Sequence, residues 1–268
     1  MTLRSSADGH SLMPERPCVH TMLCIMIAAT FAIAVILSLV HILGGRFDFL
    51  EIDPRSRWLS AAGGVTIAFL LLHLIPELNS LGEELSGHDR LGSFQQIIYV
   101  VALVGVTIFY GLEHLAFVAR PSTRECDLDS PPFGHDYVFW VHMGWYALYN
   151  MIIGILLTHG QQEEGRGLVA YGIAMGFHFA VVDAAMRSHH RHVYRRTGRW
   201  LLAPAVIAGW AVGTFVPLST VVVALITAFL AGAMLITSVK DEIPSAKQAR
   251  FVPFASGALI AAAVLVLL

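Results

Sequence analysis

Residues Gly167–His192 read GLVAYGIAMGFHFAVVDAAMRSHHRH, and this stretch decides the fold class. Its apolar part, Gly167–Arg187, is long enough to cross a bilayer, since a crossing helix needs about 20 mostly apolar residues. His178 lies near the middle of this part and Asp183 follows one and a half turns later. An ionisable group at that depth is expensive unless it meets a partner or a wet cavity. The stretch therefore predicts an integral membrane protein with a polar path inside the bilayer.

The composition agrees with this prediction. Of the 268 residues, 56% are hydrophobic and 13% are charged, against roughly 25% charged in ordinary soluble domains. The net charge of −2 and the lack of a basic run interleaved with aromatic residues exclude nucleic-acid binding. The three cysteines form no CxxC pair, which excludes a zinc ribbon or a disulfide framework. No nucleophile motif or phosphate loop is present, so we expect no enzyme.

Eight apolar runs predict eight transmembrane helices in one domain. Residues 1–18 are polar and predict a short N-terminal tail, and residues 19–268 form the membrane domain. The expected helices are Val19–Leu43, Leu59–Leu81, Ser93–Val118, Val138–Thr158, Gly167–Arg187, Trp200–Val216, Thr220–Val239 and Phe251–Leu268. The predicted fold class is thus an all-α integral membrane protein.

The basic residues predict the orientation of these helices. The loops after the odd-numbered helices hold 13 of the 17 Lys and Arg residues. Because cytoplasmic loops hold the excess of positive charge, both termini are expected outside. The basic segment Arg187–Arg199 is expected to contact anionic lipid headgroups. The compact loops favour a bacterial inner membrane. The sequence leaves open whether the protein forms a homodimer.

Polar residues on the fourth and fifth expected helices form the candidate site. Tyr149 and Asn150 lie at the depth of His178, so these residues and Asp183 form one hypothesis for a cation site. Each of these residues can instead have a purely structural role, without binding a cation. A buried Tyr is often a packed residue with a satisfied hydroxyl, Asn often joins helices in membranes, and Asp183 can pair with Arg187 four residues later.

Further polar residues lie toward the two ends of the expected path. His73 and Glu77 are four residues apart on one helical face and predict an outer mouth. The alternative is a helix end broken at Pro76, with both side chains among the headgroups. At the inner end, Asp241 and Glu242 either receive the ion or cap a helix.

Two stretches echo each other weakly. Ala68–Leu78 and Ala228–Pro244 each place an acidic residue beside a proline. In opposite membrane orientations they would form an inverted repeat, as in many secondary transporters. Chance similarity is the other interpretation.

Three strings resemble a known family. The second expected helix reads GVTIAFLLLHLIPE over Gly64–Glu77, the third ends in YGLEHL over Tyr110–Leu115, and the seventh contains AFLAGAM over Ala228–Met234, before DEIP at Asp241–Pro244. These strings resemble helices of the ZIP (Zrt-, Irt-like) family of divalent-metal transporters. The resemblance implies an eight-helix carrier that moves zinc, or iron or manganese, toward the cytoplasm as its substrate, without a resident cofactor.

The metal-binding helices depart from the family pattern. YNMIIG at Tyr149–Gly154 and HFAVVD at His178–Asp183 fall on them, and usual ligands are replaced at Ile153, Phe179 and Val182. After these replacements, the resemblance implies four remaining candidate ligands for a divalent metal: His178, Asp183, Asn150 and Tyr149. One imidazole, one carboxylate, one amide and one phenol form a borderline set for a first-row ion, with water completing the shell. We expect weak binding.

Two further functions remain open from the sequence. The first is a ZIP-shaped protein that no longer transports and acts as a metal sensor or partner subunit. The second is a haem-binding membrane redox protein with His114 and His142 as axial ligands, although no motif supports it.

Overall fold

The computed structural model describes residues 17–44, 57–86, 93–118, 135–159, 165–242 and 250–267, and almost all of them are helical. The elements are α1 (Pro17–Gly44), α2 (Arg57–Phe69), the π-helical turn η2 (Leu70–Leu74), α3 (Ile75–Ser86), α4 (Ser93–Val118), α5 (His135–Leu156), α6 (Gly165–Val193), the π-helical turn η3 (Tyr194–Gly198), α7 (Arg199–Phe215), α8 (Thr220–Glu242) and α9 (Phe251–Leu267). Each of the eight expected helices coincides with one of these runs.

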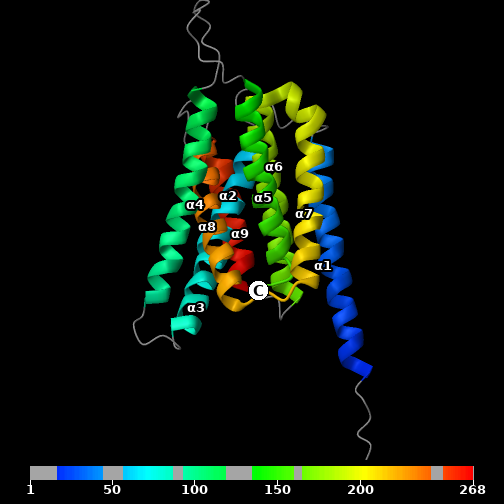
Figure 1. The fold of residues 1–268 in the computed structure, drawn as a ribbon. Coiled ribbons are helices and arrows are strands. Elements are labelled where there is room, and N and C mark those ends of the chain that lie inside the picture. The colour runs from blue at the N-terminus through cyan, green and yellow to red at the C-terminus, as the bar shows by residue number, and fades with distance from the viewer. Residues whose placement is uncertain are drawn as a thin grey trace, which may run out of the picture.

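The described helices are those of a helical membrane protein. Six of the described runs are long and apolar enough to cross a membrane, and Gly167–Arg187 is one of them. The remaining helices, α7 and α9, have 17 residues each. The first described helix begins, and α9 ends, at the same end of the bundle (Figure 1). α1 begins at Pro17, two residues before its predicted start, and residues 1–16 of the predicted tail lie outside the described residues.

The second expected helix ends later than predicted. We expected it to end at Leu81, with a break at Pro76 as the alternative, but the helix continues through Pro76 to Ser86. The π-helical turn just before the proline explains this. The backbone N–H of Ile75 donates to the carbonyl of Leu70, five residues back. This wider turn disturbs the regular hydrogen-bond ladder where proline, which lacks an N–H, would otherwise clash.

Three helix pairs pack closely through glycine in the same way. A Cβ added at Gly154 of α5 would meet the carbonyl oxygen of Val206, and one at Gly209 of α7 would meet that of Met151. Each glycine thus faces the carbonyl three residues before the other glycine. The same reciprocal pattern joins α2 to α9 through Gly64 and Gly257, and α4 to α8 through Gly105 and Gly232. Small residues at such crossings let membrane helices approach backbone to backbone.

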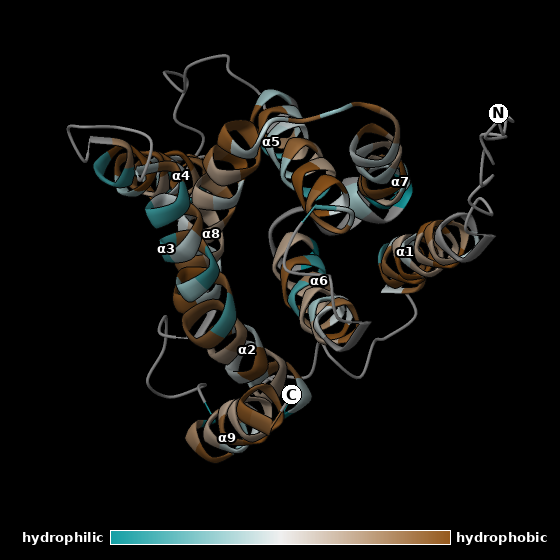
Figure 2. Ribbon diagram, turned by 90° about the horizontal axis from the view of Figure 1, so that it is seen from below, coloured by the Kyte–Doolittle hydropathy of each residue, from teal (hydrophilic) through white to brown (hydrophobic). Residues whose placement is uncertain are grey.

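The helices form two groups. One contains α2, α3, α4, α8 and α9, and the other contains α1, α5, α6 and α7, since most helix contacts fall within these sets. Figure 2, viewed along the bundle, shows the two groups side by side. The first group pairs α2 with α9 and α8 with α4. The inverted repeat of the second and seventh expected helices stays a prediction.

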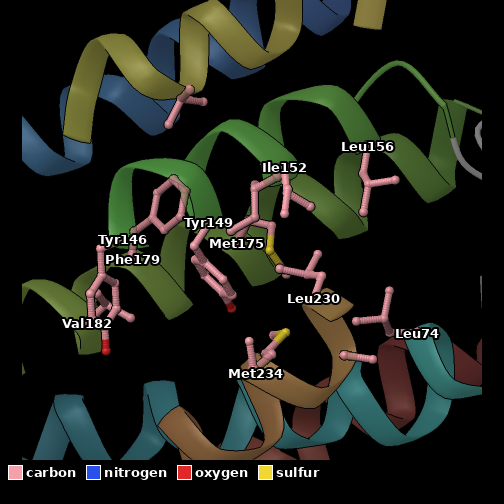
Figure 3. Close-up of a cluster of buried hydrophobic side chains, with 14 of the residues drawn as sticks. Leu74, Tyr146, Tyr149, Ile152, Leu156, Met175, Phe179, Val182, Leu230 and Met234 are labelled. Carbon is pink, nitrogen blue, oxygen red and sulfur yellow. The ribbon is translucent and has the colours of Figure 1, made fainter. Parts of the chain in front are cut away.

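The apolar core lies between the two groups. Side chains of α5 and α6 face those of α8 and of the continuous helix formed by α2, η2 and α3. Figure 3 shows this for Tyr149, Met175, Leu230 and Leu74. This layer fixes the face of α5 and α6 that meets the first group. The polar side chains of these two helices lie beside it.

Candidate functional site

The structure brings the four predicted site residues into one buried region. Tyr149 and Asn150 lie on α5, and His178 and Asp183 lie on α6. None of the four is more than 1% exposed. Tyr149 Oη and His178 Nε2 are joined by a hydrogen bond of 2.8 Å. Asn150 and Asp183 each hydrogen-bond to a third residue, which was not predicted from the sequence.

That partner is His41, in the last turn of α1. Its Nδ1 lies 2.8 Å from Asp183 Oδ1, and its Nε2 lies 3.2 Å from Asn150 Oδ1. The imidazole is fully buried, and its ring centroid lies 4.4 Å from that of Phe179. We call the five residues together the central polar cluster: His41, Tyr149, Asn150, His178 and Asp183. It joins three helices of one group.

The hydrogen bonds of Asn150 determine how His41 acts. Asn150 Nδ2 donates to the Tyr146 carbonyl at 2.8 Å, so its Oδ1 is the atom that faces His41. An amide oxygen and an ionised carboxylate only accept hydrogen bonds. The His41 ring therefore lies between two acceptors and bridges Asp183 of α6 and Asn150 of α5.

Asp183 has further neighbours at the end of α6. The Tyr194 hydroxyl donates to its Oδ1. Burial first, and then the negative charge of Asp183, raises the pKa of the Tyr194 phenol well above its usual value, so the phenol remains a donor. Arg187 Nη1 donates to the Gly44 carbonyl at 2.7 Å. A Cβ at Gly44 would crowd Asp183 Oδ2 and Arg187 Nη1, so both groups flank this glycine.

Two buried atoms of the cluster have no hydrogen-bond partner among the described residues. They are His178 Nδ1 and Asp183 Oδ2. A buried polar atom without a partner carries a desolvation penalty of about 1–3 kcal/mol. Such atoms are candidates for ligand contacts, because a bound cation or water would satisfy them.

The expected outer residues lie elsewhere in the bundle. His73 and Glu77 are half-buried on the α2–α3 run. The His73 ring packs against that of Phe69 in a tilted arrangement, with centroids 4.9 Å apart. Figure 1 places α3 at the end of the bundle opposite the junction of α6 and α7. The predicted inner residues Asp241 and Glu242 form the end of α8, and their side chains lie outside the described part of the chain.

A second polar contact joins the two helix groups. Glu113 of α4 forms an ion pair with Lys240 of α8, within the first group. The Tyr146 hydroxyl, from α5 of the second group, donates to Glu113 Oε1 at 3.3 Å. Since the Tyr146 carbonyl also holds Asn150, this tyrosine connects the ion pair to the central polar cluster.

The described residues contain no preformed metal site. Within residues 17–44, 57–86, 93–118, 135–159, 165–242 and 250–267, no three His, Cys, Asp or Glu side chains are grouped so that they could hold a metal ion. Ile153, Phe179 and Val182, where the ZIP pattern has ligands, are buried in the apolar core. Figure 3 shows Phe179 and Val182 among apolar neighbours.

The histidines of the haem hypothesis differ in their surroundings. His114 is exposed and stacks on Tyr110, whereas His142 is fully buried and stacks on Tyr146.

No family model and no curated protein sequence matches the chain. The resemblance to the ZIP family therefore rests on the sequence strings alone. His41 had one signal in the sequence: it is an ionisable residue within the apolar first helix. Its distance from Asp183 along the chain gave no indication that the two would meet.

Proposed function

We propose that the protein is a secondary transporter that moves a divalent transition-metal cation, zinc first among the candidates, across a membrane toward the cytoplasm. The observation that supports this best is the central polar cluster, in which a carboxylate oxygen and an imidazole nitrogen are buried with no hydrogen-bond partner among the described residues. Ionisable groups inside membrane bundles mark ion pathways more often than they serve packing.

The proposed cation ligands are the Asp183 carboxylate, the Asn150 amide oxygen and the His178 imidazole, with Tyr149 orienting His178. Water completes the shell, since three such ligands leave positions open. Movement of the α1, α5, α6 and α7 group against the other helices would alternate access, as in other secondary transporters. His73 and Glu77 serve the outer mouth in this proposal, and Asp241 and Glu242 serve the inner exit.

The orientation of the carrier belongs to the same proposal. With eight spans and the excess of basic residues in the cytoplasm, the end of the bundle that holds Asp183 and the Arg187–Arg199 segment faces inward. Both termini then lie outside. A bacterial inner membrane is the compartment we propose.

The second candidate is a ZIP-shaped protein without transport, acting as a metal sensor or partner subunit. The absence of a three-ligand group among the described residues favours it. So does the ring of His41, which already contacts Asp183 Oδ1 and the Asn150 amide oxygen, two of the atoms that a cation would need.

Uptake by purified protein in liposomes separates the two candidates. Zinc, manganese and iron(II) are tested in turn, with a metal-sensitive dye inside the vesicles. The transporter proposal expects uptake by the parent protein, and its loss in His178→Ala and Asp183→Asn. The matched control is His114→Ala, which removes an exposed histidine and should transport as the parent does. Failure of the parent protein to transport all three ions across a range of pH would favour the second candidate.

A further inference from the structure

Three of the described helices have an arginine followed by an exposed aromatic residue at their start. The pairs are Arg57 and Trp58 at α2, Arg199 and Trp200 at α7, and Arg250 and Phe251 at α9. The three aromatic side chains are between 56% and 78% exposed. All three helices begin at the end of the bundle where α6 joins α7 (Figure 1). Because exposed aromatic residues at helix ends mark the headgroup level of a membrane, the pairs place three arginines at one membrane boundary.

Two of these pairs lie side by side. α2 and α9 run in the same direction (Figure 1) and cross at Gly64 and Gly257, where a Cβ on either glycine would overlap the backbone of the other helix. Arg57 lies seven residues before Gly64, and Arg250 lies seven residues before Gly257. The Arg250 carbonyl already accepts from the Phe254 N–H at 3.2 Å, so Arg250 is in register with α9. Since both helices rise by about 1.5 Å per residue, the two arginines lie at the same level.

The length of α9 places its arginine close to the headgroups. α9 has 17 residues, so it is about 25 Å long, shorter than the hydrocarbon core of about 30 Å. Phe251 and Val252 are 78% and 74% exposed, and Figure 2 shows α9 beside α2 at the edge of the bundle. Lipid can therefore reach the start of both helices.

We propose that Arg57 and Arg250 together bind the phosphate of an anionic phospholipid, with Trp58 and Phe251 beside its acyl chains. A guanidinium group stays charged and donates paired hydrogen bonds to phosphate oxygens. Two such groups at one level complement the net negative charge that an anionic headgroup has and a zwitterionic headgroup lacks. The site concerns the lipid around the protein and not a transported ion, so it stands independently of the proposed function.

The pair at the start of α7 differs in one respect. The Arg199 guanidinium carbon lies 5.4 Å from the centre of the Trp200 ring, a cation–π contact. α7 crosses α5 at Gly209 and Gly154. Ten residues before this crossing, where α7 has Arg199, α5 has Gly144. This pair thus contains one arginine where the start of α2 and α9 contains two, so we assign the phosphate to the α2–α9 pair.

Native mass spectrometry of the purified protein with added phosphatidylglycerol or phosphatidylcholine tests the inference. The parent protein should bind phosphatidylglycerol about tenfold more tightly than phosphatidylcholine. Arg57→Gln and Arg250→Gln should each weaken phosphatidylglycerol binding about tenfold, because each removes charge-assisted hydrogen bonds to the phosphate. The matched control is Arg196→Gln, which removes an exposed arginine of η3 at the same end of the bundle. It should bind phosphatidylglycerol as the parent does.

Several results would overturn the inference. An equal loss of binding in Arg196→Gln would show diffuse attraction by basic residues in place of a paired site. A parent protein that binds both lipids equally would remove the charge preference. Should Arg250→Gln fail to fold, Arg57→Gln alone decides, because Arg57 is exposed, and unchanged phosphatidylglycerol binding by this variant overturns the site. Inorganic phosphate at constant ionic strength should leave the lipid bound, and displacement of the lipid would assign the arginines to a free anion.

Discussion

Adding one methyl group at Gly209 should separate two helices next to the central polar cluster. A Cβ at this position would overlap the carbonyl oxygen and carbon of Met151, which are backbone atoms and cannot rotate away. The crossing of α5 and α7 must therefore widen. Met151 directly follows Asn150, so the displacement occurs at the level of the proposed cation ligands. Overpacking of this kind destabilises a protein by about 1–3 kcal/mol.

Gly144 of α5 provides the matched control. A Cβ there would meet nothing within 4 Å. Replacing a helical glycine by alanine at an open position stabilises the helix by roughly 0.5–1 kcal/mol. Gly209→Ala and Gly144→Ala add the same atoms, yet we expect them to change the free energy of unfolding in opposite directions. Their difference should be about 1.5–4 kcal/mol.

Unfolding in mixed detergent micelles, followed by circular dichroism, measures this difference. The reasoning predicts a lower midpoint for Gly209→Ala and an equal or higher midpoint for Gly144→Ala, relative to the parent protein. Equal midpoints for the two variants would refute the close α5–α7 crossing. Uptake or zinc binding should fall in Gly209→Ala only, because only that variant moves the backbone beside Asn150.

Three other predictions address single contacts and the orientation. Tyr146→Phe removes the 3.3 Å bond to Glu113 and should lower the free energy of unfolding by about 1 kcal/mol in the same assay; an unchanged midpoint would contradict a stabilising bond. His41→Ala removes the ring that bridges Asp183 Oδ1 and Asn150 Oδ1 and should lower that free energy by about 1–3 kcal/mol, whereas an unchanged midpoint would contradict a stabilising bridge. A cysteine at exposed Ser80 of α3 should react with an impermeant thiol reagent in intact cells, and one at exposed Trp58 of α2 only after permeabilisation; the reverse pattern would invert the proposed orientation.

The helices could be predicted well from the sequence because their lengths follow from apolar composition. The expected run Gly167–Arg187 returns unchanged as a membrane-span candidate, and Ser93–Val118 has the bounds of α4. The passage of the helix through Pro76 could not be predicted, since it depends on a local π-helical turn. Apolar periodicity carries no information about such a change in the hydrogen-bond ladder.

The candidate site was predictable only in part. Tyr149, Asn150, His178 and Asp183 share a membrane depth that can be counted along two helices, and they do lie together. The contact of His41 with Asp183 joins residues 142 positions apart and depends on how α1 packs against α6. Pairing between helices follows from three-dimensional packing, so the residue that bridges Asp183 and Asn150 was missed.

The most direct test of the central claim is the position of a bound metal. Crystals of the parent protein grown with zinc should show an anomalous scattering peak beside His178 and Asp183. A zinc peak absent from the central polar cluster, with His41 still bridging Asp183 and Asn150, would contradict the account.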